Sequence, residues 1–286
     1  MRNAKNHNCS IRAGLTLIEL MLSVAILSFT VVALGMMLRS VEIASEYNMG
    51  YGTTAQHARV TMDRIDRAVS QANSIYSSSP KEDYAGTWTT EDVIGNYNFP
   101  DTLIVWRPPA SGTLADSQGI PASELVIFCP DPTTPNRLLE VTVPNDTRKA
   151  LPPPNGTASA FKSFIDGLKT ESGVNQILLT DLVYTATISG SASPKAAVRF
   201  VVTMNPSSSD WRLYSPQPGD PPATKAFTDL PWSQSICSPN CGLRQVWVRT
   251  EIQLKPAGTW TVTSTAAETP VPYFGSSAYC YEITTP

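Results

Sequence analysis

Proline is missing from the first 79 residues of this 286-residue chain, and all 24 prolines lie between Pro80 and Pro286. Because proline interrupts helices, the N-terminal part can be largely helical and the remainder cannot. The length allows one large domain or two small ones. An apolar content of 42% excludes a wholly disordered chain. The sequence therefore has two parts that meet near Pro80.

Histidine is scarce, since the chain contains only His7 and His57. The part after Pro80 therefore offers no histidine for acid–base catalysis or for a histidine-rich zinc site. It also lacks a phosphate-binding glycine loop and a nucleophile elbow. The acidic residues of its loops are more commonly solvated than bound to calcium (Asp210, Asp220 and Asp229). We expect no enzyme activity, no cofactor and no metal site.

Charge is almost absent from one long apolar run, Leu15–Leu38, in which Glu19 is the single charged residue. The 19 uncharged residues Leu20–Leu38 form roughly 28 Å of helix, close to the hydrocarbon thickness of a bilayer. We therefore expect one membrane span. The flanking charges predict a cytoplasmic N-terminus, because basic residues precede the run and acidic residues follow it (Arg2, Lys5 and Arg12; Glu42 and Glu46).

Two features of this run do not suit an ordinary secretory signal. The small pair Ala13-Gly14 lies before the apolar run, whereas a signal peptidase site follows it. Glu19 places a carboxylate early in the span, which costs on the order of 3 kcal/mol unless the carboxylate is paired. Both features lie in the string AGLTLIELMLSVAIL. This string closely resembles the class III signal of type IV prepilins and pseudopilins, a family that combines the two features.

The resemblance implies a processing site and an assembly residue. A prepilin peptidase would cut after Gly14 and methylate the new N-terminus at Leu15, where the family usually has phenylalanine. Glu19 would be the fifth mature residue, and its carboxylate would pair with the amine created by cleavage, in the same molecule or a neighbour. The simpler alternative is that the Glu19 carboxylate interacts only with lipid headgroups or with the positive end of the helix dipole.

The resemblance also implies an α+β, pilin-like fold, with a long N-terminal helix packed on an antiparallel β-sheet head. The expected parts are a leader (1–14), a transmembrane half-helix (15–38), an amphipathic stalk helix (39–79) and an exported β-rich head (80–286). The segment Ala58–Ala72 resembles, less specifically, large minor pilins and J-type minor pseudopilins.

The function implied is that of a structural subunit of a type IV pilus or a type II secretion pseudopilus. The implied partners are the prepilin peptidase, other pilins or pseudopilins, the inner-membrane assembly platform and membrane lipid. The location implied is the bacterial inner membrane and then the filament. A DNA-uptake filament stays open, although the acidic chain gives no support for a nucleic-acid partner. The alternative is a single-pass anchored surface-binding or adhesion protein that does not polymerise.

Apolar residues continue past the membrane as a narrow stripe with a spacing of three or four. This period predicts a helix with one buried face up to about Ser77. Gly50 and Gly52 predict a bend or a melted stretch in it, and Asp63 with Arg67 predicts a stabilising pair. The stripe consists of Ala44, Tyr47, Tyr51, Ala55, Ala58, Met62, Ile65, Val69, Ala72 and Tyr76.

The part after Pro80 contains short apolar runs between proline and serine clusters, as expected for strands and loops. One short helix is predicted near Ala158–Leu168. In QVWVRTEIQL, alternate residues from Val246 to Leu254 predict one buried strand face. The predicted strands are Thr102–Trp106, Leu125–Phe128, Leu138–Val143, Gln176–Thr187, Ala197–Met204, Gln245–Leu254 and Thr259–Thr263.

Cysteines number five, and Cys9 lies in the leader. Its removal leaves an even set, which suits disulfides in an exported head. We predict that Cys237 pairs with Cys241, and Cys129 with Cys280. Four cysteines allow three pairings, and buried reduced thiols are a further alternative. Loss of the leader also removes three basic residues and no acidic one, which changes the formal charge from −3 to −6.

Overall fold

The structure is a computed structural model that describes residues 16–72, 86–107, 119–150, 157–191, 193–214, 221–229, 242–256 and 271–284. The chain forms two compact units, Met1–Gly50 and Tyr51–Pro286. Helix α1 (Leu17–Ser70) begins in the first unit and ends in the second. Strands in the second unit pair antiparallel. The expected α+β class is therefore confirmed.

Helix α1 is continuous over 54 residues. It runs through Gly50 and Gly52, so the prediction of a melted stretch there is wrong. It ends at Ser70 and not near Ser77, because poor helix formers such as Asn73 and Ser74 follow. The helix closes with shorter backbone bonds, in which the Gln71 N–H donates to the carbonyls of Arg67 and Ala68.

A five-stranded antiparallel sheet has the order β1-β2-β4-β5-β7. Its strands meet in a register that places Leu103 opposite Phe128 and Glu140 opposite both Phe128 and Ile177. The bounds are β1 (Thr87–Ile94), β2 (Tyr97–Trp106), β4 (Leu125–Pro130), β5 (Leu138–Thr142) and β7 (Asn175–Thr180).

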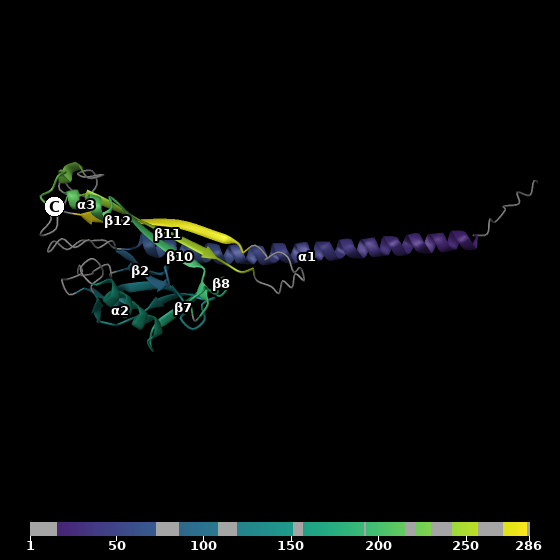
Figure 1. Cartoon of the computed structure of the whole chain (residues 1–286), viewed down its shortest axis with the longest axis horizontal. Coiled ribbons are helices and arrows are strands. Elements are labelled where there is room, and N and C mark those ends of the chain that lie inside the picture. The colour runs from purple at the N-terminus through teal and green to yellow at the C-terminus, as the bar shows by residue number, and fades with distance from the viewer. Residues whose placement is uncertain are drawn as a thin grey trace, which may run out of the picture. The chain divides into compact units, whose positions relative to one another are not determined.

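A three-stranded sheet, β10-β11-β12, is formed by later parts of the chain (Figure 1). Its strands are β10 (Val198–Asn205), β11 (Gly242–Gln253) and β12 (Tyr273–Thr284). Two small pairs are β3 (Ile120–Pro121) with β6 (Lys149–Ala150), and β8 (Thr185–Ala186) with β9 (Lys195–Ala196). Among its described residues, this unit also contains the helices α2 (Ala158–Thr170) and α3 (Ser208–Tyr214) and two 3₁₀ turns (Ala122–Glu124 and Phe227–Asp229).

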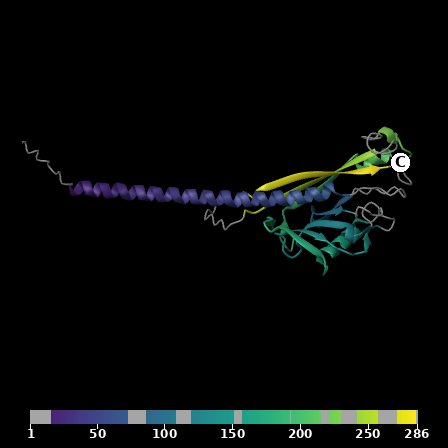
Figure 2. The same ribbon diagram turned by 180° about the vertical axis from the view of Figure 1, so that it is seen from behind.

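The two larger sheets and the C-terminal part of α1 share one core. Within the second unit, the stripe residues Ala58, Met62, Ile65 and Val69 are buried, as predicted. Both views show β12, in yellow, alongside this part of α1 (Figures 1 and 2). The other side chains of this core are Ala68, Leu103, Val105, Val126, Phe128, Leu138, Val183, Val198, Phe200, Val248, Ile252, Leu254 and Ala278.

Polar contacts also fix this part of the helix. The Arg64 guanidinium forms an ion pair with Glu140 on β5, with 3.1 Å between Nη2 and Oε1. The Ser276 hydroxyl on β12 donates to the Asp66 carboxylate at 3.0 Å. The predicted pair of Asp63 and Arg67 is present on the exposed face, with 2.7 Å between nitrogen and oxygen.

Helix α2 covers the opposite face of the five-stranded sheet. It begins where the Thr157 hydroxyl accepts a hydrogen bond from the Ala160 N–H, a typical N-cap. Its residues Phe161 and Ile165 pack on Trp106 and Ile127, which alternate with the residues of the first core. The central strands β2, β4 and β5 are therefore largely buried on both faces, and they read as nearly continuous apolar runs.

Most predicted strands are found at or near their expected places. In β11, the predicted alternation is confirmed, because the side chains of Val246, Val248, Thr250, Ile252 and Leu254 are buried in turn. The run predicted as Gln176–Thr187 is instead two strands, β7 and β8, and the predicted α2 is present. Strands β1 and β12 and the two-residue strands β3, β6 and β9 were not predicted, and Thr259–Thr263 lies outside the described residues.

Candidate functional site

The start of α1 is closed by a reciprocal pair of hydrogen bonds. The Thr16 N–H donates to Glu19 Oε2 at 3.0 Å, and the Glu19 N–H donates to Thr16 Oγ1 at 3.4 Å. The Thr16 hydroxyl also donates to Glu19 Oε2, at 3.1 Å. This is a capping box, in which a threonine and a glutamate three residues later satisfy each other's backbone donor.

The following apolar helix satisfies its own polar side chains. The hydroxyls of Ser23, Ser28 and Thr30 donate to helix carbonyls at 2.7 Å, 2.8 Å and 2.8 Å. Together with Thr16 and Glu19, these are all the polar side chains between Thr16 and Leu38. The three hydroxyls therefore need no water as a hydrogen-bond partner, which suits a helix in hydrocarbon, whereas the bonds to the Glu19 carboxylate go only to Oε2.

The apolar side chains of this segment, unlike its hydroxyls, have no hydrogen-bond partners within the helix and are exposed. Every large apolar side chain from Leu17 to Leu38 is exposed, and Phe29 is 77% exposed. Among the described residues, α1 is the one helix long and apolar enough to cross a membrane. The predicted processing residues Gly14 and Leu15 lie outside the described residues, so only Glu19 of the three predicted assembly and processing residues has a described position.

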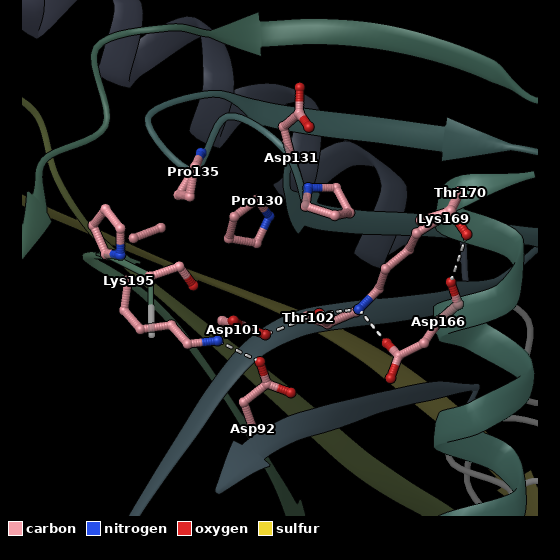
Figure 3. Close-up of a pocket in the computed structure, with 14 residues that line it drawn as sticks. Asp92, Asp101, Thr102, Pro130, Asp131, Pro135, Asp166, Lys169, Thr170 and Lys195 are labelled. Atoms are coloured by element: carbon pink, nitrogen blue, oxygen red, sulfur yellow. Dashed lines mark hydrogen bonds and ion pairs between the residues drawn. The ribbon is translucent and has the colours of Figure 1, made fainter. Parts of the chain in front are cut away.

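A pocket of about 230 Å³ lies in the second unit. Segments distant in the sequence meet there: β1, β2, the loop between β4 and β5, the end of α2, and β9 with the residues before it (Figure 3). The lining consists of prolines, aspartates, lysines and a few small residues: Asp92, Asp101, Thr102, Pro130, Asp131, Pro132, Pro135, Asp166, Lys169, Thr170, Ser193, Pro194, Lys195 and Ala196.

A chain of ion pairs crosses the floor of the pocket, and Figure 3 shows its two ends, Lys195 with Asp92 and Lys169 with Asp166. Asp92 accepts from Lys195 Nζ at 2.6 Å and from Lys162 Nζ at 2.9 Å. Lys162 also reaches Asp166 at 2.6 Å, and Lys169 reaches the other oxygen of Asp166 at 2.7 Å. Each of the three lysines is therefore held by at least one carboxylate.

The ion pairs of this network shift the pKa values of Asp92 and Lys162. Burial raises the pKa of Asp92, but the hydrogen bonds from Lys195 and Lys162 outweigh burial and bring this pKa to about 2. Burial lowers the pKa of Lys162, but Asp166 and Asp92 outweigh it and raise this pKa to about 12. Both groups are therefore charged over the whole neutral range.

Asp101 differs from the other carboxylates of the pocket floor because no lysine among the described residues forms an ion pair with it, although the charges of Lys169 and Lys195 act on it. Its Oδ1 accepts a hydrogen bond from the Thr102 hydroxyl at 3.0 Å, and that hydroxyl in turn accepts from Lys169 at 2.9 Å. Burial first, and then the nearby charge of Asp92, raise the pKa of Asp101. The carboxylate is therefore the least well compensated charge of the pocket floor.

The predicted Cys129–Cys280 disulfide is wrong for this structure, in which Cys129 is a free, buried thiol. Cys129 lies in the core under α2, whereas Cys280 packs beside Val246 in a different cluster. Alternation along β4 turns Cys129 away from the face that the three-stranded sheet covers. Burial raises the pKa of the Cys129 thiol to about 12, and Cys237 and Cys241 lie outside the described residues.

Metal binding has no support in the described residues, where no three His, Cys, Asp or Glu side chains gather as ligands. Comparisons of the chain with protein-family models, with curated proteins and with solved structures gave no match. The features of the described residues that bear on function are the helix start, the apolar helix and the pocket.

Proposed function

We propose that the chain is a minor pilin or minor pseudopilin with a pilin-like fold, a structural subunit of a type IV pilus or a type II secretion pseudopilus. A prepilin peptidase cuts it after Gly14, and it assembles with other pilins or pseudopilins through α1. The observation that carries the proposal is the combination of the leader sequence with an apolar helix whose Ser23, Ser28 and Thr30 hydroxyls donate to carbonyls of the same helix.

The apolar part of α1 supports this role because its surface suits both environments that a pilin helix meets, the lipid bilayer and the filament core. Before assembly, exposed side chains from Leu17 to Leu38 suit contact with lipid, and hydroxyls bonded to helix carbonyls suit the absence of water. After assembly, the same surface packs against the helices of neighbouring subunits. The basic leader orients the span with the N-terminus in the cytoplasm of a bacterial cell, and the second unit is exported.

The geometry of Glu19 supports a role in assembly beyond capping. Both bonds that its side chain accepts go to Oε2. A carboxylate has about four lone-pair sites, so Oε1 keeps the capacity to bind a cation. The nearest cation expected in a filament is the Leu15 amine of this subunit or of a neighbour. In a low-dielectric filament core, loss of one partner strands the other at a cost of several kcal/mol.

The test separates charge from helix capping. Glu19→Gln retains the capping box, because glutamine also serves at that position, and it removes the charge. We expect normal insertion and cleavage but at least about tenfold less of the subunit in purified filaments, since a stranded amine costs several kcal/mol. The readout is the amount of the full chain that co-purifies with filaments sheared from its own host.

The matched control is Thr16→Ala, which weakens the cap by about 1 kcal/mol and retains the carboxylate. We expect near-normal incorporation of this variant. Incorporation of Glu19→Gln at the wild-type level would show that the carboxylate does not direct assembly. Equal loss in both variants would assign the effect to capping alone.

The second candidate is an anchored surface-binding protein that does not polymerise. The pocket favours this candidate, because a purely structural subunit needs no concave site. The two candidates differ in the fate of residues 1–14, which a plain anchor retains and a pilin loses.

A further inference from the structure

We propose that the pocket of the second unit binds the ammonium or guanidinium group at the end of an unbranched aliphatic chain, as carried by a lysine or arginine side chain of a partner protein. This inference goes beyond assembly through α1 and does not rest on it. The residue that anchors the cation is Asp101.

The size of the pocket limits its occupant. Its volume of about 230 Å³ is below the 300–1,000 Å³ of common small-molecule sites. A single extended side chain fits such a space, and a nucleotide or an oligosaccharide does not. The walls suit an aliphatic stem, because four prolines line them: Pro130, Pro132, Pro135 and Pro194.

The polar groups of the pocket favour a ligand that only donates hydrogen bonds. Proline has no backbone N–H, so the four proline positions offer carbonyls and no donors. The lysines of the lining are already paired, Lys195 with Asp92 and Lys169 with Asp166. An anion would meet carboxylates and occupied lysines. Ammonium and guanidinium groups, which donate and never accept, match the remaining acceptors.

Two pocket carboxylates retain an oxygen without a hydrogen bond from any described residue. Asp101 accepts only at Oδ1, from Thr102. Asp131 accepts only at Oδ1, from Thr133 and Thr134. Figure 3 places Asp131 on the opposite side of the pocket from Asp101 and Asp92, with its carboxylate directed away from them. A cation in the pocket would therefore meet the Asp101 carboxylate at the floor.

The compensation of the carboxylates is uneven, and Asp101 receives the least of it. The lining carries four aspartates and two lysines, Lys162 adds a positive charge behind it, and Arg137 is near enough to Asp131 to lower the pKa of that carboxyl. Partial burial and the charge of Asp92 already raise the pKa of Asp101. A bound cation removes this penalty by compensating the Asp101 charge. A metal ion does not fit as well, because the described residues contain no suitable group of ligands.

The experiment uses the detergent-solubilised full chain with ¹³C-labelled threonine methyl groups. The probes are N-acetyl-lysine methylamide and N-acetyl-arginine methylamide, with N-acetyl-citrulline methylamide as the neutral isostere of arginine. We expect saturable shifts at Thr102 and Thr170, which line the pocket, and none at Thr87 and Thr250, which do not. Citrulline should bind at least about tenfold more weakly than arginine, because it lacks the charge.

Asp101→Asn is the matching change in the protein and should weaken binding of the cationic probes at least about tenfold. Asp229→Asn, at an exposed site outside the lining, should leave binding unchanged. The comparison of citrulline with arginine uses the wild-type protein, so it still tests the proposal if Asp101→Asn impairs folding. Absence of saturable shifts, equal affinity for citrulline and arginine, or full binding by a folded Asp101→Asn protein would overturn the proposal.

A free polyamine carries the same chemistry, so spermidine forms a second arm. Tighter binding of the capped lysine or arginine supports a protein partner that inserts a basic side chain. Tighter binding of spermidine supports a cation site but overturns the assignment to a protein side chain.

Discussion

The two units of the chain differ in the exposure of their apolar side chains. In the first unit, Phe29 is 77% exposed, and in the second unit Phe128 is fully buried. Both residues lie in apolar stretches of the sequence. Burial of a phenylalanine stabilises a fold by about 1.5–3 kcal/mol, so an exposed apolar surface persists only where the surroundings are themselves apolar. The contrast indicates that the second unit contains its own core, whereas the first exposes an apolar helix that is long enough to cross a membrane.

The largest expected effect compares these two phenylalanines directly. Phe128→Ala should destabilise the second unit by about 3–5 kcal/mol, because it leaves a cavity in the core between the sheets and α1. Phe29→Ala should change the same unfolding free energy by less than about 0.5 kcal/mol. Denaturant unfolding of the detergent-solubilised full chain, followed by near-UV circular dichroism, measures both. Similar losses in the two variants would contradict the separation of the units.

A second comparison places a charge at two sites on α1. Ile26→Lys should weaken membrane insertion by about 2.5–3.5 kcal/mol, because lysine then lies inside the hydrocarbon. Val60→Lys, at another exposed position on the same helix, should have no such effect. The fraction of each variant that resists alkaline extraction from membranes measures its insertion. If both variants stay in the membrane equally well, the span does not include Ile26.

A smaller effect is expected from the ion pair that joins α1 to β5. Glu140→Gln should destabilise the second unit by about 1–2 kcal/mol, because the Glu140 side chain is only 10% exposed and its bond to Arg64 is charge-assisted. Asp63→Asn removes the exposed pair with Arg67 and should cost only about 0.3–0.5 kcal/mol. Denaturant midpoints compare the two variants. A larger cost for Asp63→Asn would reverse this ranking.

A separate effect is the pH dependence of the pocket network. The folded pKa of Asp92, about 2, lies below its ordinary value of 3.8. Its stabilising contribution is therefore fully present above about pH 4 and is lost as the pH falls through 2. Stability of the wild type should fall over this range more steeply than that of Asp92→Asn. Asp229→Asn should retain the wild-type slope, and parallel curves for wild type and Asp92→Asn would exclude the network as the cause.

Local sequence patterns predicted the elements whose burial follows a simple period. The stripe from Ala58 to Val69 and the alternation in β11 both have one buried face, and both were predicted. Strand β12 was missed because YFGSSAYCYEIT contains glycine and serine, and pairing with β11 determines its conformation. The capping box was also overlooked, although the letters TLIE carry its pattern.

The pocket could not be predicted, because its groups come from distant parts of the chain. Only Lys162, Asp166 and Lys169 lie at helical spacing and could have been paired from the sequence. Asp92, Asp101 and Lys195 join them through the packing of β1, β2 and β9. The Cys129 error has a similar origin, since an even count of cysteines says nothing about the sheet face on which each one lies.

The most direct test of the central claim is the intact mass and N-terminal sequence of the chain extracted from the membrane of its own host. We predict a mature chain that begins at Leu15 with a methylated amine, and an uncut precursor when Gly14 is replaced by a bulky residue. A chain that retains Met1, or one that begins beyond Leu38, would contradict the claim that it is a processed filament subunit.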